Sequence, residues 1–169
     1  MWSDLSETAY RIAPRVNAAI VAVPAPGPDA ADTRAPVGGR IILYGGDDGT
    51  NPRNDLWVYD VAARVWEQPE GLKGDPPSAR SRHTLTLVRY VRPETQKEED
   101  RIYLYGGVGT LAEDVMYLDM ARRSWELPRA IGEKPMPLLG HTAAQVRGAW
   151  CVVCSSVRKR TAECAYTGS

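Results

Sequence analysis

The sequence predicts an all-β fold in which four-stranded antiparallel sheets stack side by side, like the blades of a β-propeller. A long block occurs twice, and four of its residues recur 59 positions later: Asp55, Asp60, Trp66 and Pro69. The apolar runs in each copy are short, rich in β-branched and aromatic residues, and bounded by Gly, Pro and Asp. Repeats with periods of tens of residues indicate stacked architectures, because a sheet with two apolar faces must bury both against neighbours.

The first predicted strand, 16–23, ends at a Pro-rich stretch. The next run, 41–44, and its copy, 102–105, are too short for stable helices, so we expect central strands buried on both faces. Each is followed by a glycine pair, which permits positive φ and a close approach of two backbones. These pairs are Gly45 with Gly46 and Gly106 with Gly107.

The runs 56–59, which contains Trp57, and 115–118 predict the following strands, because Asp residues on both sides turn the chain. Trp66 and Trp125 each mark a short further strand before a Pro-rich link. The alternating stretch 83–88 predicts the first strand of the next unit. Two strands of a third unit are predicted at 141–146 and 150–154.

Together these residues resemble the kelch repeat over about residues 40–142: strand and Gly-Gly, spaced Asp and aromatic residues, Trp, then Pro and His-Thr. The resemblance implies a partial kelch β-propeller of about two and a half four-stranded antiparallel blades, which does not close into a ring. It also implies a set of structural repeat residues: Gly45, Gly46, Trp57, Trp66, His83, Gly106, Gly107, Trp125 and His141.

The predicted organisation follows the repeat. Residues 1–39 hold the last strand of a preceding blade, marked by Trp2, and the first strand and loop of the next; 40–82 complete that first well-matched unit; 83–140 form the second; 141–156 are a partial third; and 157–169 are a divergent tail. Trp2 precedes Arg15 by nearly the spacing that separates Trp66 from Arg80. An insertion at 89–100 lengthens the second unit beyond the usual kelch period of about 50 residues.

The bulk composition excludes several classes of partner. Lys and Arg together number 21, as do Asp and Glu, whereas a nucleic-acid surface normally carries a basic patch, so we expect no nucleic-acid partner. No run approaches the roughly 18 apolar residues of a spanning helix, so we expect no membrane partner. Because no signal-peptide pattern occurs and three cysteines cannot all pair, we expect an intracellular, cytoplasmic protein.

Residues that resemble catalytic or metal sites have structural explanations. His83 and His141 are the two histidines and occupy equivalent repeat positions. Cys151 and Cys154 have zinc-like spacing, but residues i and i+3 of a strand point to opposite faces, and no His follows Cys164. The glycines after 105 lack the Lys-Ser/Thr of a P-loop, and the acidic loop at 47–51 does not fit an EF-hand. We therefore predict no catalytic residue, no metal and no cofactor.

The kelch resemblance implies a protein–protein interaction module, here a fragment of a longer propeller protein, with a partner that the sequence does not identify. Kelch partner sites lie on one face, built from loops between the second and third strands and from loops that link blades; here these are 47–54, 108–113, 68–82 and 128–140. The candidate partner contacts are Asp48, Asn51, Arg53 and Arg80. Arg80 fits equally well as a donor that ties two loops together. The charged insertion 94–100 is either a solvated loop or a contact segment.

Two alternatives stay open. The first is a kelch-type enzyme, because some kelch-type propellers resemble galactose oxidase or act as iron-dependent specifier proteins. Such metal sites need converging ligands, and this sequence shows no pattern of that kind. The chain could instead be a truncated, non-functional product, or an open arc completed by another chain. Its open blade edges would in that case allow self-association.

Overall fold

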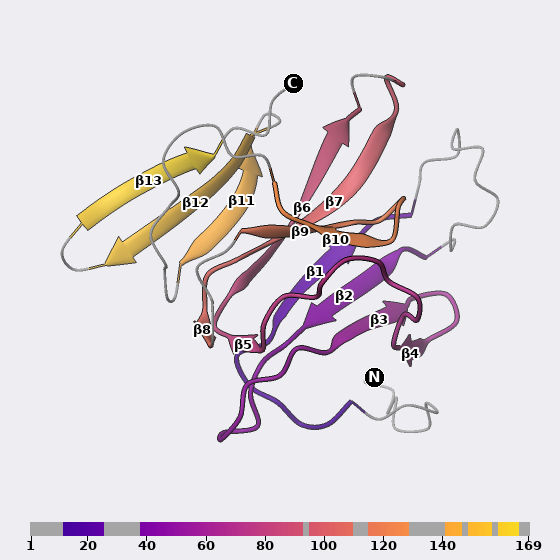
Figure 1. Cartoon of the computed structure of the whole chain (residues 1–169), viewed down its shortest axis with the longest axis horizontal. Helices are drawn as coiled ribbons and strands as arrows, with labels where there is room; N and C mark the ends of the chain where they lie inside the picture. The colour runs from indigo at the N-terminus through magenta and orange to yellow at the C-terminus, as the bar shows by residue number, and fades with distance from the viewer. Residues whose placement is uncertain are drawn as a thin grey trace, which may run out of the picture.

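The computed structural model contains thirteen β-strands and no helix in the part of the chain that it describes (Figure 1). The described residues are 12–25, 38–92, 95–109, 115–128, 141–146, 149–156 and 159–165. The all-β prediction is therefore confirmed. Within these ranges, no helix is long and apolar enough to cross a membrane.

Two of the sheets have four antiparallel strands each. The first sheet has the order β1-β2-β3-β4, and its strands are β1 (Ala19–Val23), β2 (Arg40–Tyr44), β3 (Leu56–Asp60) and β4 (Val65–Glu67). The second sheet has the order β6-β7-β9-β10, and its strands are β6 (Thr84–Val91), β7 (Glu98–Tyr105), β9 (Met116–Asp119) and β10 (Ser124–Glu126). This order, from the first strand outward, is the blade that the repeat predicts.

The third sheet has three strands in the described part of the chain: β11 (Thr142–Val146), β12 (Ala149–Ser156) and β13 (Lys159–Ala165). A two-stranded ribbon joins β5 (Arg80–Ser81) to β8 (Val108–Gly109). The sequence assigned 157–169 to a divergent tail, and the structure places a seven-residue strand there. Backbone pairing with β12 along its length accounts for this strand, because such pairing needs no repeat residue.

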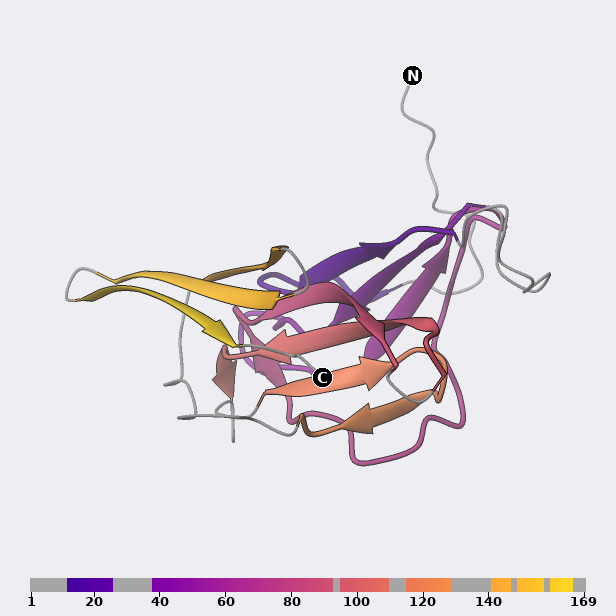
Figure 2. The same cartoon turned by 90° about the horizontal axis from the view of Figure 1, so that it is seen from above.

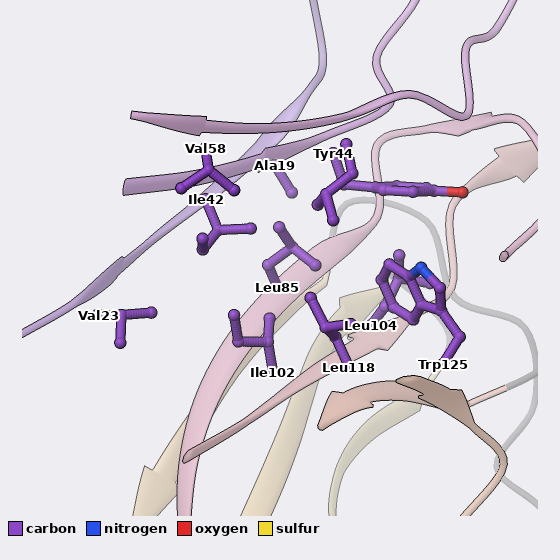
Figure 3. Packing of buried hydrophobic residues seen from close by; sticks show 11 residues of the cluster. Ala19, Val23, Ile42, Tyr44, Val58, Leu85, Ile102, Leu104, Leu118 and Trp125 are labelled. Atoms are coloured by element: carbon purple, nitrogen blue, oxygen red, sulfur yellow. The ribbon is translucent and has the colours of Figure 1, made fainter. Parts of the chain in front are cut away.

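The sheets stack face to face and do not close into a ring, which confirms the partial propeller (Figures 1 and 2). The first strands of the sheets line up, since β6 contacts both β1 and β11. Figure 3 shows the core between the first two sheets, where Ile42 and Tyr44 point toward Leu104 and Trp125. A second core, which includes Tyr103, Tyr105, Trp150 and Val152, lies between the second and third sheets.

The same aromatic contact recurs in both units. Tyr44 meets the ring of His83 edge-on at 5.8 Å, and Tyr105 meets His141 at 5.1 Å. Each tyrosine ends the second strand of one blade, and each histidine precedes the first strand of the next. The His-Thr signature of the repeat thus marks a joint between neighbouring blades.

The connections differ from the regular repeat in two places. The insertion extends β6 and β7 to eight residues each, and they form one long hairpin. The link after β4 crosses to the second sheet, where Lys73 pairs with Ser124 along the outer edge of β10.

The first strand is shorter than the predicted range 16–23. Val16 makes an isolated bridge to Asp47, and β1 begins later, at Ala19. The predicted strand at Trp2 and most of the link 128–140 lie outside the described residues.

Candidate functional site

One face of the molecule gathers loops from the first two blades, and we call residues 15–18, 45–55, 78–83 and 106–109 the loop face. Backbone hydrogen bonds connect these segments directly. Val16 and Asp47 exchange two bonds of 2.9 Å, and Gly46 N–H donates to the carbonyl of Arg80 at 3.0 Å. Arg80 N–H in turn donates to the carbonyl of Arg53 at 3.0 Å. The β2–β3 loop, at the lower end of the sheets in Figure 1, is therefore held by both the preceding strand entry and the following link.

The glycine pairs make this close packing possible. A Cβ on Gly45 would lie 2.5 Å from the carbonyl oxygen of Arg80, and one on Gly107 would lie 2.5 Å from that of Ser81. Both glycines have positive φ, 61° and 100°, which other residues rarely adopt. The repeat thus uses glycine where a loop must touch the backbone of the next blade.

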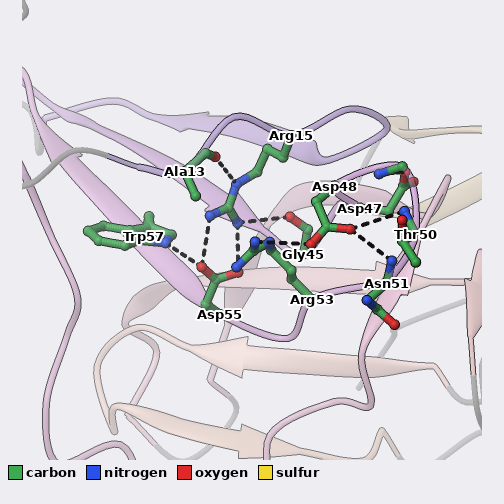
Figure 4. A network of polar contacts seen from close by, with 11 residues as sticks. Ala13, Arg15, Gly45, Asp47, Asp48, Thr50, Asn51, Arg53, Asp55 and Trp57 are labelled. Atoms are coloured by element: carbon green, nitrogen blue, oxygen red, sulfur yellow. Dashed lines mark hydrogen bonds and ion pairs between the residues drawn. The ribbon is translucent and has the colours of Figure 1, made fainter.

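A partly buried ion pair supports the loop at its base (Figure 4). Arg15, whose side chain is 5% exposed, donates to both carboxylate oxygens of Asp55 at 2.6 and 2.9 Å. The same guanidinium donates to the carbonyl of Gly45 at 3.1 Å, and Trp57 Nε1 donates to Asp55 at 2.7 Å. Burial alone would raise the pKa of Asp55, but the hydrogen bonds from Arg15 and Trp57 outweigh it and hold that pKa below its usual value.

The structure distinguishes the two interpretations of Arg80. This side chain is 1% exposed, and it donates to the carbonyl of Gly106, the carbonyl of Ser78 and the hydroxyl of Ser78. A partner could not reach a side chain so enclosed. The burial of Arg80 therefore contradicts its prediction as an exposed partner contact. The geometry fits the other interpretation, a donor that ties loops of two blades together.

Asp48, Asn51 and Arg53 lie together at the exposed tip of the β2–β3 loop. Asp48 accepts backbone N–H bonds from Thr50 and Asn51 at 3.0 and 2.9 Å, and Arg53 donates to its other carboxylate oxygen at 3.2 Å. The Asn51 and Thr50 bonds hold the pKa of Asp48 below its usual value. The side chains of the Asp48–Arg53 pair are each 35% exposed. This tip presents a carboxylate, an amide and a guanidinium on a turn in which the backbone N–H groups of residues 48–51 all donate hydrogen bonds.

Asp47 anchors the base of that tip. Its carboxylate accepts from Asn17 Nδ2 at 3.2 Å and from Gly49 N–H at 3.1 Å. The hydrogen bonds from Asn17 and Ser81 lower the pKa of Asp47. Asp47 therefore joins the β2–β3 loop to segments from both neighbouring connections.

Arg15 and Asp47 support the β2–β3 loop, and neither role was predicted from the sequence. The position of Arg15 in the repeat was the available signal, since it donates to the first glycine of one pair as Arg80 does to that of the next. Asp47 carries no comparable signal, because it gains its role through contacts that the local sequence does not record.

The two histidines are buried and take part in packing. His83 and His141 are 6% and 7% exposed. Burial, followed by the nearby Arg80 charge, lowers the pKa of His83 to about 4, so this ring is neutral at physiological pH. His141 Nε2 and the Thr84 hydroxyl lie 2.9 Å apart and form a hydrogen bond. Among the described residues, no three His, Cys, Asp or Glu side chains gather closely enough to hold a metal ion.

A groove of about 960 Å³ lies between the first and second sheets and beside the link after β4. Its floor is apolar and includes Tyr44 and Trp125, while its rim carries charges of both signs, among them Glu67 and Arg123. These groups do not form a nucleophile with an adjacent base, the arrangement that would indicate covalent catalysis.

Comparison with known proteins identifies the repeat. The KLHDC2/KLHL20/DRC7 Kelch-repeats domain matches residues 13–155. The Rab9 effector protein with kelch motifs of Bos taurus is 31% identical over 106 residues, which cover 60% of this chain and 26% of that protein. The Xenopus laevis protein of the same name is 31% identical over 108 residues, or 61% of this chain and 27% of that protein. The Arabidopsis thaliana serine/threonine-protein phosphatase BSL2 is 40% identical over 85 residues, covering 44% of this chain and 8% of the phosphatase.

Proposed function

This chain belongs to the kelch-repeat family, and on that premise we propose that it is a protein-interaction module that binds its partner through the loop face. The observation that carries the proposal is a contrast within one loop. The tip at Asp48 and Asn51 is exposed, while the base is held by the partly buried Arg15–Asp55 pair and by backbone bonds to both flanking segments. Recognition by loops on a rigid scaffold needs this combination.

The proposed contact residues are Asp48, Asn51 and Arg53. They lie within one turn and offer donors, acceptors and both signs of charge to a partner. Contacts of this kind at an interface rim set orientation and specificity, while apolar neighbours contribute more of the affinity. The bond from Arg53 to Asp48 fixes both side chains before a partner arrives, which lowers the entropic cost of binding.

The names of the relatives favour a protein partner over a small molecule. Two of them are named Rab9 effectors, so a Rab-class small GTPase is the first purified partner to test. The chain spans about a quarter of the length of these relatives. We therefore infer that its three sheets are an arc of a larger propeller, and that the partners of a whole protein belong to that larger assembly.

A catalytic role is not part of the proposal. The two histidines are buried against tyrosines and occupy repeat positions, so they are poorly placed as ligands of a copper or iron centre. The BSL2 relative is named a phosphatase, but the matched part is 8% of that protein, and a shared fold does not transfer an activity.

Two charge-reversal variants test the proposal. Asp48→Arg alters the loop tip, and Glu67→Arg makes a comparable change at an exposed position of β4, away from the loop face. Proteins captured from cell extract by the unaltered chain would be compared with those retained by each variant, and the same variants would be titrated with Rab9 loaded with a GTP analogue. We expect at least one specific protein to be lost with Asp48→Arg and kept with Glu67→Arg. Equal retention by both variants, with both folded, would contradict the proposal.

A further inference from the structure

Two cysteines occupy directly opposed positions in the third sheet. Cys151 is in β12 and Cys164 is in β13, and the antiparallel register makes them Cα partners. Opposed residues of an antiparallel pair have Cα atoms about 4.5 or 5.5 Å apart, according to whether the two residues exchange hydrogen bonds. A disulfide spans Cα atoms that are roughly 4.4 to 6.8 Å apart. The backbone register therefore places these two positions within the range that a disulfide needs, whichever kind of pair they form.

The third cysteine does not share this placement. Cys154 is three positions further along β12, and its partner in the register is Thr161. Successive residues of a strand alternate between the two faces of a sheet, so Cys151 and Cys154 belong to opposite faces. Directly opposed residues, by contrast, share a face. The register therefore selects Cys151 with Cys164 from the pairs that three cysteines allow.

The surroundings of Cys151 leave it accessible to a small oxidant. Trp150 and Val152, its neighbours in β12, are buried against the second sheet. Cys151 therefore belongs to the face that points away from the second sheet, and it is half-buried. Its partner on the β11 side is Ala144, which is exposed. Because alanine is small, β11 places no bulky side chain directly opposite Cys151.

β13 is the strand of this sheet that a covalent link would affect most. In the part of the chain that the structure describes, it is the edge strand of the third sheet and is hydrogen-bonded to β12. Among the described elements, β12 is also the strand with which β13 makes extensive contact. Local opening begins where few neighbours hold a segment, so β13 is expected to detach more readily than a strand that is paired on both sides.

We propose that Cys151 and Cys164 form a reversible disulfide, with glutathione disulfide as the oxidant, and that this bond fastens β13 to β12. The Cys151 thiolate attacks one sulfur of glutathione disulfide, whose S–S bond breaks as the first glutathione leaves. The Cys164 thiolate then attacks the Cys151 sulfur of the mixed disulfide and releases the second glutathione. The protons of the two cysteines pass through solvent to the departing glutathione thiolates. Two cysteine thiols are thus oxidised, one glutathione disulfide is reduced to two thiols, and excess reduced glutathione reverses both steps.

The bond makes the attachment of β13 depend on redox conditions. It encloses residues 152–163, and a cross-link around a loop of this size restricts the opened chain. We expect the amide hydrogens of β13 to exchange roughly a hundredfold more slowly in the oxidised chain than in the reduced one. Unchanged exchange after the bond has formed would overturn the claim that it fastens the strand. The two cysteines are not part of the loop face, so partner binding there is tested separately.

Peptide mapping of the oxidised full chain tests the pairing. The reduced protein would be incubated with glutathione disulfide, its remaining thiols would be blocked, and it would be cut with trypsin without reduction. Trypsin releases Cys151 and Cys164 in different peptides, 148–158 and 161–169. We expect these two peptides to be linked in most of the oxidised chains. Glutathione adducts alone, a bond between Cys151 and Cys154, or links between chains would each overturn the proposal.

A matched pair of variants identifies which cysteine of β12 takes part. Cys151→Ser removes the residue opposite Cys164, and Cys154→Ser removes the other cysteine of the same strand. We expect the linked peptides to be lost with Cys151→Ser and kept with Cys154→Ser. Urea supplies a control that needs no variant, because unfolding removes the register and should lower the yield of linked peptides roughly tenfold or more. Equal yields from the two variants, or equal yields with and without urea, would overturn the proposal.

Discussion

Arg15 and Asp55 lie 40 positions apart and form a two-pronged ion pair, with N–O distances of 2.6 and 2.9 Å, beneath the exposed tip of the β2–β3 loop. The pair also holds the carbonyl of Gly45 and the indole N–H of Trp57. It thereby links the entry to β1, the glycine turn after β2 and the start of β3. Together with the backbone bonds that Val16 and Arg80 make to the same loop, this cluster holds the loop face of the first blade.

Arg15→Ala should destabilise the chain by about 2 kcal/mol, because it leaves the Asp55 carboxylate partly buried without its charged partner. Urea titration measures this loss. Arg53→Ala is the matched control, since it removes an arginine from an exposed pair whose side chains are each 35% exposed, and such pairs contribute little to stability. Equal losses for the two variants would contradict the supporting role of Arg15.

Gly74→Ala should destabilise the chain more than Gly71→Ala. Both glycines have positive φ, 74° and 68°, so either alanine carries a backbone strain of about 1 kcal/mol or more. A Cβ on Gly74 would also lie 2.3 Å from the carbonyl oxygen of Trp125, whereas one on Gly71 meets nothing within 4 Å. Because both variants carry the backbone strain, the difference between their midpoints of unfolding measures the cost of the clash between the link and β10. Identical midpoints would mean that the link does not rest on the second sheet.

Acidification should weaken the fold before its carboxylates titrate. Burial lowers the pKa of His83 to about 4 from an ordinary 6.5. Between these values the unfolded chain binds a proton that the folded chain does not, so the free energy of unfolding falls as the pH falls from 6.5 to 4. The loss reaches about 3 kcal/mol at the lower end.

Urea titrations at several pH values measure this dependence. His83→Phe should flatten it between pH 6.5 and about 5, while leaving the losses below about pH 5, where Asp55 and the other carboxylates with lowered pKa begin to lose their contribution. An unchanged slope in the variant would show that another group titrates in this window.

The hairpin of β6 and β7 should loosen when Arg92 is removed. Arg92 forms a two-pronged pair with Glu99, and its guanidinium lies 3.6 Å from the fully buried carboxylate of Asp119. We expect Arg92→Ala to cost about 1–2 kcal/mol and to speed amide hydrogen exchange in the hairpin, because Asp119 loses one of its neighbouring cations. Arg89→Ala, at a pair 3.7 Å long with a side chain 53% exposed, should change exchange little. The reverse order of effects would contradict this account.

The sequence predicted most of the blades because their signals are local. The runs at 41–44 and 102–105, the glycine pairs and the spaced tryptophans each report on their own strand and turn, and the repeat doubles every signal. β13 was not predicted, because its residues begin with a basic run and its stability comes from pairing with β12. The burial of Arg80 was open for a similar reason, since its partners, Ser78 and Gly106, belong to different blades.

The kelch resemblance predicted partner contacts on the β2–β3 loop, and the structure brings Asp48, Asn51 and Arg53 together there; their role as contacts stays a prediction. The residues that support the loop tip could not be predicted from the sequence. Arg15 and Asp47 gain their roles through contacts across tens of positions, and alternation along β2 predicts two buried faces without saying what covers the second.

Photo-cross-linking from the loop face tests the central claim most directly. A photoreactive amino acid would be placed at Asn51, on the loop tip, and separately at Glu67, an exposed residue of β4. The account predicts a covalent adduct with a partner protein from position 51 and little from position 67, in chains that melt at the same temperature. Adducts of equal yield from both positions, or from position 67 alone, would contradict binding through the loop face.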